Sequence, residues 1–263
     1  MCIRDSIIPE YDSERCTEAA KILKNTAIKA GAPDDCIQWI ISSEETDNII
    51  RSHKKVNILL YPNNFSNIPC YIEETADLKM AVHHLILSRS FDWGLVPGTE
   101  ETVFIDESIY GDVISLLRNS GCYIPTKDEQ VKLTSVIIDL SSGTVNPKVI
   151  GKSPSDIAQM ADMELPDDVK LICLELDKPG PEQPLMKSKP APVLSLIRTC
   201  GWKDCLILSK NLLLYKPETS GFVIHSNNTD IINEFSKELK TKRVITNTAG
   251  IHTCLLYTST LLI

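Results

Sequence analysis

The stretch TVFIDESIYGDVISLLRN, residues 102–119, decides the fold class of this 263-residue chain. Its first five residues, 102–106, are four apolar or β-branched side chains followed by Asp106, a run that predicts a buried strand. Residues 107–119 predict a helix that ends at Gly121, a residue typical of helix C-termini. A buried strand that leads straight into a helix is the repeating unit of α/β proteins.

The alternation of strands and helices extends over the chain on both sides of this stretch. Ser153, Pro154 and Asp156 supply one clear helix start, with an N-cap, a proline in the first turn and an acid that favours the helix dipole. Thr126 and Glu129 form a capping box for another helix, which is predicted to run towards residue 140. This order predicts helices covering a largely parallel sheet. The remaining helices are predicted at 13–28, from 43, at 77–90, 202–214 and 230–239, and the remaining strands at 36–41, 56–60, 70–72, 169–176, 193–197, 222–225 and 243–246.

Composition and charge exclude several classes of protein. With 43% hydrophobic and 24% charged residues, the chain can bury one good core or two modest ones. No apolar run approaches the ~18 residues that a membrane span requires, so we expect no membrane association. The formal net charge of −8 repels a phosphate backbone and argues against nucleic acid as a partner.

The nine cysteines and five histidines show no metal-ligand spacing, so we expect no metal centre. No two cysteines form a C-x-x-C pair, and several lie inside apolar runs such as 36–41, where a free thiol packs as a small hydrophobe. This pattern predicts a reducing compartment. His83 and His84 are adjacent in a predicted helix, where their side chains diverge by about 100°, so the two cannot face one site.

The acids and the remaining motifs leave one candidate site. Glu73-Glu74 is interpreted as a solvated approach to a helix, and Glu100-Glu101 as neighbours in sequence that need not share a site. No phosphate-binding glycine loop, nucleophile elbow or catalytic-triad spacing occurs in the sequence. The stretch that invites a site is FDWGLVPGTE, residues 91–100, a loop with Gly and Pro between a helix and a strand. Rigid α/β scaffolds place catalytic groups on such loops.

This loop and its flanks resemble the nucleophile region of CoA-acylating aldehyde dehydrogenases. Residues 86–94 (ILSRSFDWG), Glu100 and residues 103–106 (VFID) carry the likeness. The resemblance implies an aldehyde dehydrogenase-like α/β fold, with a partial Rossmann-like NAD-binding domain, an α/β catalytic domain, and oligomers built through an extra β-flap. Further collinear likenesses lie at 16–22, 30–33, 37–40, 146–151, 153–158, 174–175, 180–185, 192–194, 224–226 and 245–248.

The same resemblance divides the chain into segments. Residues 7–75 are interpreted as a remnant of the NAD-binding domain, and residues 76–250 as the catalytic-domain-like region. Residues 1–6 and 254–263 resemble translated sequencing adapters and are interpreted as non-native ends, with a longer natural protein on both sides. The alternative is that Met1 is the true start.

The resemblance also identifies positions at which this chain departs from the family. The family places a nucleophilic cysteine in a Gly-x-x-Cys-Ala-Ser-Glu pattern, and here Pro97 stands at that position, followed by Gly98 and, as in the family, Glu100. Proline offers neither a nucleophile nor a backbone N–H for an oxyanion. Ser188 aligns with the family's glutamate on the nicotinamide ribose, and Ser220 aligns with a histidine of the family.

A further departure lies between residues 60 and 70, where a short Asn/Pro segment replaces the family's nicotinamide loop. The first hypothesis is therefore a truncated, degenerate relative that no longer converts aldehyde, NAD and CoA into acyl-CoA and NADH. The second is an active enzyme whose site is obscured by sequence errors, and the third is a non-catalytic oligomer subunit or a small-ligand-binding module. The resemblance implies NAD and CoA as cofactors, a small aldehyde as substrate, a homo- or hetero-oligomer, and the cytoplasm or a bacterial microcompartment as location.

Overall fold

This computed structural model of the protein describes residues 13–34, 37, 68–96, 98–139, 141–177, 179–180, 183–215, 221–241 and 243–253. The chain divides into two compact units, Met1–Asn64 and Phe65–Ile263. The predicted domain boundary between residues 75 and 76 lies after strand β1 (Ile68–Ile72), which pairs within the sheet of the second unit.

Helix α1 (Ser13–Lys29) lies in the first unit and confirms the helix predicted at 13–28. Gly31 follows it with a positive φ of 93°, and the Ala32 N–H donates to the Ala27 carbonyl at 3.0 Å. Glycine adopts this left-handed conformation without a steric penalty, which explains why the helix ends here.

Among the described residues of the second unit, seven parallel strands form one sheet in the order β3-β6-β7-β2-β1-β8-β9. The centre of the sheet is β2 (Glu100–Asp106), which pairs with β1 on one side and with β7 (Val193–Thr199) on the other. The predicted α/β fold with a largely parallel sheet is thereby confirmed. The remaining strands are β3 (Cys122–Tyr123), β6 (Leu171–Leu176), β8 (Phe222–His225) and β9 (Val244–Thr246), and an antiparallel pair is formed by β4 (Ile138–Asp139) and β5 (Thr144–Val145).

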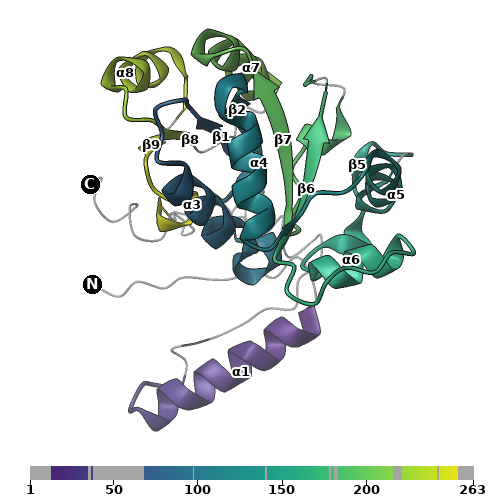
Figure 1. Ribbon diagram of the computed structural model, residues 1–263. Coiled ribbons are helices and arrows are strands. Elements are labelled where there is room, and N and C mark those ends of the chain that lie inside the picture. Colours follow the sequence, from purple (N-terminus) through teal and green to yellow (C-terminus); the bar gives the residue numbers. More distant parts are fainter. Residues whose placement is uncertain are drawn as a thin grey trace. The chain divides into compact units, whose positions relative to one another are not determined.

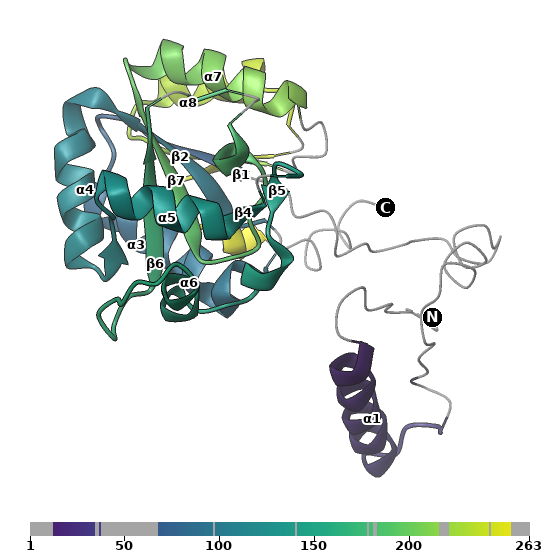
Figure 2. The ribbon, with the colours of Figure 1, turned by 90° about the vertical axis from the view of Figure 1, so that its right-hand side faces the viewer.

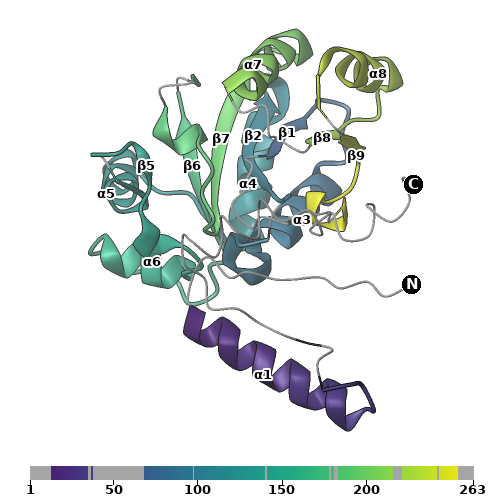
Figure 3. The ribbon, with the colours of Figure 1, turned by 180° about the vertical axis from the view of Figure 1, so that it is seen from behind.

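Helices cover both faces of the sheet. α3 (Leu78–Ser90) and α4 (Tyr110–Asn119) pack on one face, and α4 lies in front of β2 and β7 in Figure 1. α7 (Trp202–Tyr215) and α8 (Thr229–Glu238) pack on the opposite face and lie next to each other in Figures 2 and 3. The chain steps from β1 to β2 in one direction and from β7 to β8 in the other, so right-handed crossovers put these helices on opposite faces.

Shorter helical elements complete the second unit. α5 (Lys127–Ile137) and α6 (Pro154–Met160) pack on the same face as α7 and α8. The 3₁₀ helices are η1 (Phe91–Gly94), η2 (Glu107–Ile109), η3 (Pro147–Val149), η4 (Pro184–Met186) and η5 (Gly250–Thr253). No helix in the described part of the chain is both long and apolar enough to cross a membrane.

The sheet separates two buried apolar clusters. Successive strand residues point to opposite faces, so Phe104 joins the cluster under α7 and α8, while Val103 joins the cluster under α3 and α4. On the α7 and α8 side, Phe235 of α8 is fully buried. Its ring lies 5.5 Å from that of Tyr71 and 5.3 Å from that of Phe222, measured between centroids. These aromatic contacts anchor α8 to β1 and β8.

Local sequence signals located most of these elements. The capping box at Thr126 forms as predicted, and the predicted N-cap Ser153 forms a capping box with Asp156. The predicted extension of the first of these helices towards residue 140 is wrong, because Ile138 leaves the helix to pair with Val145. The strands predicted at 36–41 and 56–60 and the helix predicted from 43 lie outside the described residues, apart from Ile37.

We expect Phe235→Ala to lower the free energy of unfolding by about 3–5 kcal/mol, because it removes a buried ring and leaves a cavity beside Tyr71 and Phe222. Urea unfolding of the whole chain measures the change. Ile207→Ala on α7 is the control, since that side chain is 59% exposed, and it should alter the stability by no more than about 0.5 kcal/mol. Equal losses in the two variants would contradict the assignment of Phe235 to the core.

Candidate functional site

The candidate loop joins the end of α3 to the start of β2, and its backbone is unusual at its beginning. Asp92 and Trp93 have φ values of 49° and 48°, a left-handed conformation that costs free energy in residues other than glycine. Gly94 follows with φ at 76°, and a Cβ atom there would lie 2.5 Å from the carbonyl oxygen of Ala191. Glycine is therefore required at residue 94, where the loop meets the segment that leads into β7.

Arg89, in the last turn of α3, is hydrogen bonded to this loop. The side chain is fully buried, and its Nη1 donates to the Thr99 hydroxyl at 2.9 Å. Nη1 also lies 3.5 Å from the Gly94 carbonyl oxygen, and Nε donates to the Val193 carbonyl at 3.2 Å. A further hydrogen bond joins Nη2 to the Lys189 carbonyl. One guanidinium thus fixes both ends of the loop and the entry to β7.

Glu101 supplies the negative charge for two buried cations. Its carboxylate lies 3.6 Å from Arg89 Nη1 and 3.9 Å from Lys189 Nζ, and all three side chains are at most 4% exposed. The Lys189 ammonium also donates to the carbonyls of Leu185 at 2.5 Å and Lys187 at 3.1 Å. Buried charges persist only when they are paired and hydrogen bonded, and this cluster meets both conditions. We call Arg89, Glu101 and Lys189 the ion cluster.

A register shift between β1 and β2 brings Glu101 into this position. Ile68 pairs with Glu100, but Pro69 pairs with Thr102, so one extra residue lies on β2. Such bulges change the direction in which neighbouring side chains point. Glu100 and Glu101 are consequently both buried and have different partners.

Glu100 contacts a different part of the chain. Its Oε1 accepts the N–H of Gly250 at 2.8 Å. Burial raises the pKa of the Glu100 carboxyl, against the opposing effects of its hydrogen bonds and of Arg89. A Cβ on Gly250 would lie 2.7 Å from the Gly98 carbonyl oxygen and 3.0 Å from Glu100 Oε2, so η5 closes tightly over the start of β2.

The structure places three of the five predicted site residues. Gly98 has φ at 91°, Glu100 is fully buried, and the Ser188 hydroxyl donates to Glu101 Oε1 at 3.0 Å. Ser188 and the candidate loop therefore lie at the same edge of the sheet, although 87 residues separate Ser188 from Glu101. Pro97 and Ser220 lie outside the described residues.

Sequence reasoning missed the ion cluster and was wrong about Glu73. Arg89 lies in the quoted stretch 86–94 and Lys189 follows Ser188, but neither was assigned a role. The one available signal in the sequence was that each of these charged residues stands in an apolar or proline-rich setting, where burial of the side chain is more frequent. Glu73 is 2% exposed and accepts hydrogen bonds from Thr75 and from the Ser226 hydroxyl (2.7 Å), so it clamps β1 to β8 and is not a solvated approach.

The cysteines whose side chains are described, Cys70, Cys122, Cys173, Cys200 and Cys205, are free thiols. Burial raises the pKa of Cys70 and Cys205 well above the ordinary range. A hydrogen bond with Cys122 and burial do the same for Cys173. Cys200 is exposed, but the negative charge of Glu107 raises its pKa. Among the residues that the structure describes, no group of three or more His, Cys, Asp and Glu side chains could hold a metal ion.

Comparison with known proteins shows which proteins have a similar sequence and a similar architecture. No family model matches the chain. Aldehyde-alcohol dehydrogenase 2 of Entamoeba histolytica is 28% identical over 256 residues, which cover 88% of this chain and 29% of that protein. Aldehyde-alcohol dehydrogenase of Clostridium acetobutylicum is 32% identical over 252 residues, with coverage of 87% and 29%. The crystal structure of an acetylating aldehyde dehydrogenase from Geobacillus thermoglucosidasius superposes with a TM-score of 0.79 at 27% identity, over 93% of this chain and 58% of that one.

The parallel sheet, the loop before β2 and these matches define an α/β domain of the aldehyde dehydrogenase type. More narrowly, the chain belongs to the acylating aldehyde dehydrogenase family, whose members include the aldehyde-alcohol dehydrogenases. The resemblance found in the sequence is confirmed. The chain spans about 29% of the length of the aldehyde-alcohol dehydrogenases that it matches.

We expect Glu101→Gln to lower the free energy of unfolding by about 3–5 kcal/mol, because it leaves the Arg89 and Lys189 charges buried without a counter-charge. Urea denaturation followed by circular dichroism measures the loss. Glu74→Gln removes a charge from an exposed acid of the same unit and serves as the control. A Glu101→Gln variant as stable as Glu74→Gln would show that the ion cluster does not stabilise the loop.

Proposed function

We propose that this chain is a non-catalytic member of the acylating aldehyde dehydrogenase family, with the loop framework of the site but without its thiol chemistry. The observation that carries the proposal is the proline at residue 97, between Val96 and Gly98. Covalent catalysis by the family begins with attack of a thiolate on the aldehyde carbonyl, and proline has no atom that can make this bond.

Four of the described thiols, those of Cys70, Cys173, Cys200 and Cys205, offer no replacement. Cys70, Cys173 and Cys205 are fully buried, and their pKa values are raised, so each stays a protonated thiol near neutral pH. Cys200 follows the opposite, carboxyl end of β7, whereas the candidate loop precedes β2. Because a nucleophile must be placed to within about an ångström, none of these thiols suits the reaction.

At residue 188, which the structure describes, the expected cofactor contact of the family is not matched. Ser188 stands where the family's ribose-binding glutamate is expected, and its hydroxyl is bonded to Glu101. The nearest carboxylate is that of Glu101, which is 3% exposed and whose negative charge is neutralised by Arg89 and Lys189. It is therefore not offered to a ribose. NAD, CoA and a small aldehyde as ligands, oligomerisation, and a cytoplasmic or microcompartment location remain predictions.

We expect the full chain to form no NADH from aldehyde, NAD and CoA above a heat-denatured sample. Pro97→Cys should also stay inactive, because it restores the thiol without the missing nicotinamide loop. Absorbance at the NADH band measures both, with Pro97→Ser as the matched control and an active family member as the standard. Turnover by the unaltered chain would overturn the proposal in favour of an active enzyme. Turnover by Pro97→Cys alone would confine the defect to the thiol.

Calorimetric titration separates the two non-catalytic alternatives. A scaffold or oligomer subunit should give no heat of binding with NAD or with CoA. Saturable binding of either ligand would identify a small-ligand-binding module.

A further inference from the structure

Two histidines outside the candidate site form a buried aromatic pair. His84 in the middle of α3 and His225 at the end of β8 have ring centroids 5.6 Å apart, with 27° between the ring planes. The residues are 8% and 2% exposed. Among the described residues, neither His84 Nδ1 nor His225 Nε2 has a hydrogen-bond partner. The rings are therefore packed as neutral groups, one on a helix and one on the sheet.

The backbone on the sheet side of this pair is fixed. The carbonyl of His225 accepts the Glu73 N–H at 3.0 Å, and the side chain of Asn247 brackets Ser226 with hydrogen bonds of 3.0 Å and 2.8 Å. These hydrogen bonds oppose movement of β8, so a charge on either imidazole favours displacement of α3 over displacement of the strand.

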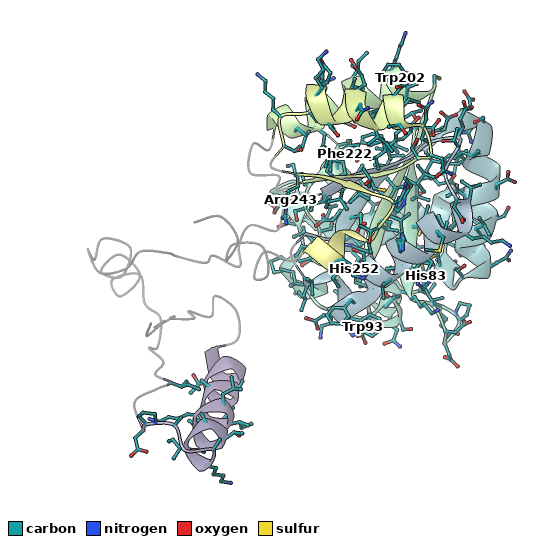
Figure 4. All side chains as sticks on the ribbon, turned by 90° about the vertical axis from the view of Figure 1, so that its left-hand side faces the viewer. His83, Trp93, Trp202, Phe222, Arg243 and His252 are labelled. Carbon is teal, nitrogen blue, oxygen red and sulfur yellow. The ribbon has the colours of Figure 1, made fainter. Side chains whose placement is uncertain are left out.

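The surroundings offer such a charge little compensation. His83 lies next to His84 on α3 with its ring centroid 6.0 Å away, and His252 approaches from η5; Figure 4 shows both of these residues on their adjoining elements. Glu73, at the end of β1, is the acid nearest in the hydrogen-bond network, and its Oε2 is engaged by Thr75 and Ser226. Burial lowers the pKa of His84, with further lowering by His83 and His252. Burial and His84 lower the pKa of His225 from 6.5 to about 4.

α3 connects the histidine pair to the candidate loop. One turn beyond His84, the Ser88 hydroxyl accepts the Ile251 N–H of η5 at 3.2 Å. The next residue is Arg89, which holds Gly94 and Thr99 of the loop. A shift of α3 away from β8 would therefore pull on the loop through its own last turn.

We propose that the His84–His225 pair is an acid-sensitive latch that holds α3 and the described loop residues 94–96 and 98–99 against the sheet at neutral pH and releases them on protonation. This inference does not rest on the proposed function. A depressed pKa in the fold means that the unfolded or released state binds protons more readily. The latch is consequently complete above about pH 6.5 and weakens as the pH falls towards about 4.

Trp93, which is 41% exposed in η1, reports on the loop. In a full-length chain with Trp39→Phe and Trp202→Phe, Trp93 emission should change between pH 6.5 and 4 before the far-ultraviolet circular dichroism of the sheet is lost. Adding His84→Phe and His225→Phe keeps two stacked rings without a titrating nitrogen. This variant should move the midpoint to lower pH by about one unit or more, or abolish the change. His83→Gln, at the exposed neighbouring position, is the control and should leave the midpoint in place.

Two results would overturn the latch. One is a Trp93 transition at the same pH in the chain with two phenylalanines, and the other is no transition in the parent chain down to pH 4. If the doubly substituted chain does not fold, the single His84→Gln variant answers the same question, because removing one titrating ring should still lower the midpoint. Carbon-13 spectra of labelled histidine provide a direct check, since the His84 and His225 imidazoles should stay neutral until the loop signal changes.

Discussion

The buried carboxylate of Glu101 is the constraint on which the rest of the site depends. It neutralises charges from two segments that are far apart in sequence, the end of α3 at Arg89 and the approach to β7 at Lys189. Neither cation could remain buried alone, since an unpaired charge in an apolar interior costs several kcal/mol. The loop between α3 and β2 has to follow the path that this arrangement permits. This path requires left-handed backbone conformations at Asp92 and Trp93, which cost free energy, and a glycine at residue 94.

This dependence would account for a loop framework that remains in place under the proposed loss of the family's thiol chemistry. The hydrogen bonds that hold the described residues of the loop involve Gly94, Thr99 and the backbone before β7. Loss of Glu101 would remove the counter-charge of both Arg89 and Lys189 and would thereby affect the path of the loop.

Much of the fold could be predicted from the sequence, because the decisive signals were local. The capping boxes at Thr126 and Ser153 and the apolar run of β2 each lie within a few residues of chain. The two-residue strands β3, β4 and β5 carry no detectable periodicity and were missed. The burial of Glu73 and Glu101 could not be predicted, because it depends on partners at residues 226 and 189 that only the folded sheet brings near. The sequence indicated the candidate loop, but it did not indicate the buried charges of the ion cluster that hold this loop.

α3 contains two kinds of buried polar group, and their different chemistry divides the helix in two. Arg89 at its end stays cationic at any physiological pH, because a guanidinium does not lose its proton there, so the loop anchor is a fixed charge. Burial lowers the Arg89 pKa, but Glu101 and Glu100 oppose that change. His84 in the middle of the helix is buried as a neutral ring and has no such carboxylate partner among the described residues. Acid therefore acts first on the middle of α3. Arg89 transmits the displacement of the helix to the loop, because it belongs to the ion cluster through Glu101 and is hydrogen bonded to Thr99 of the loop.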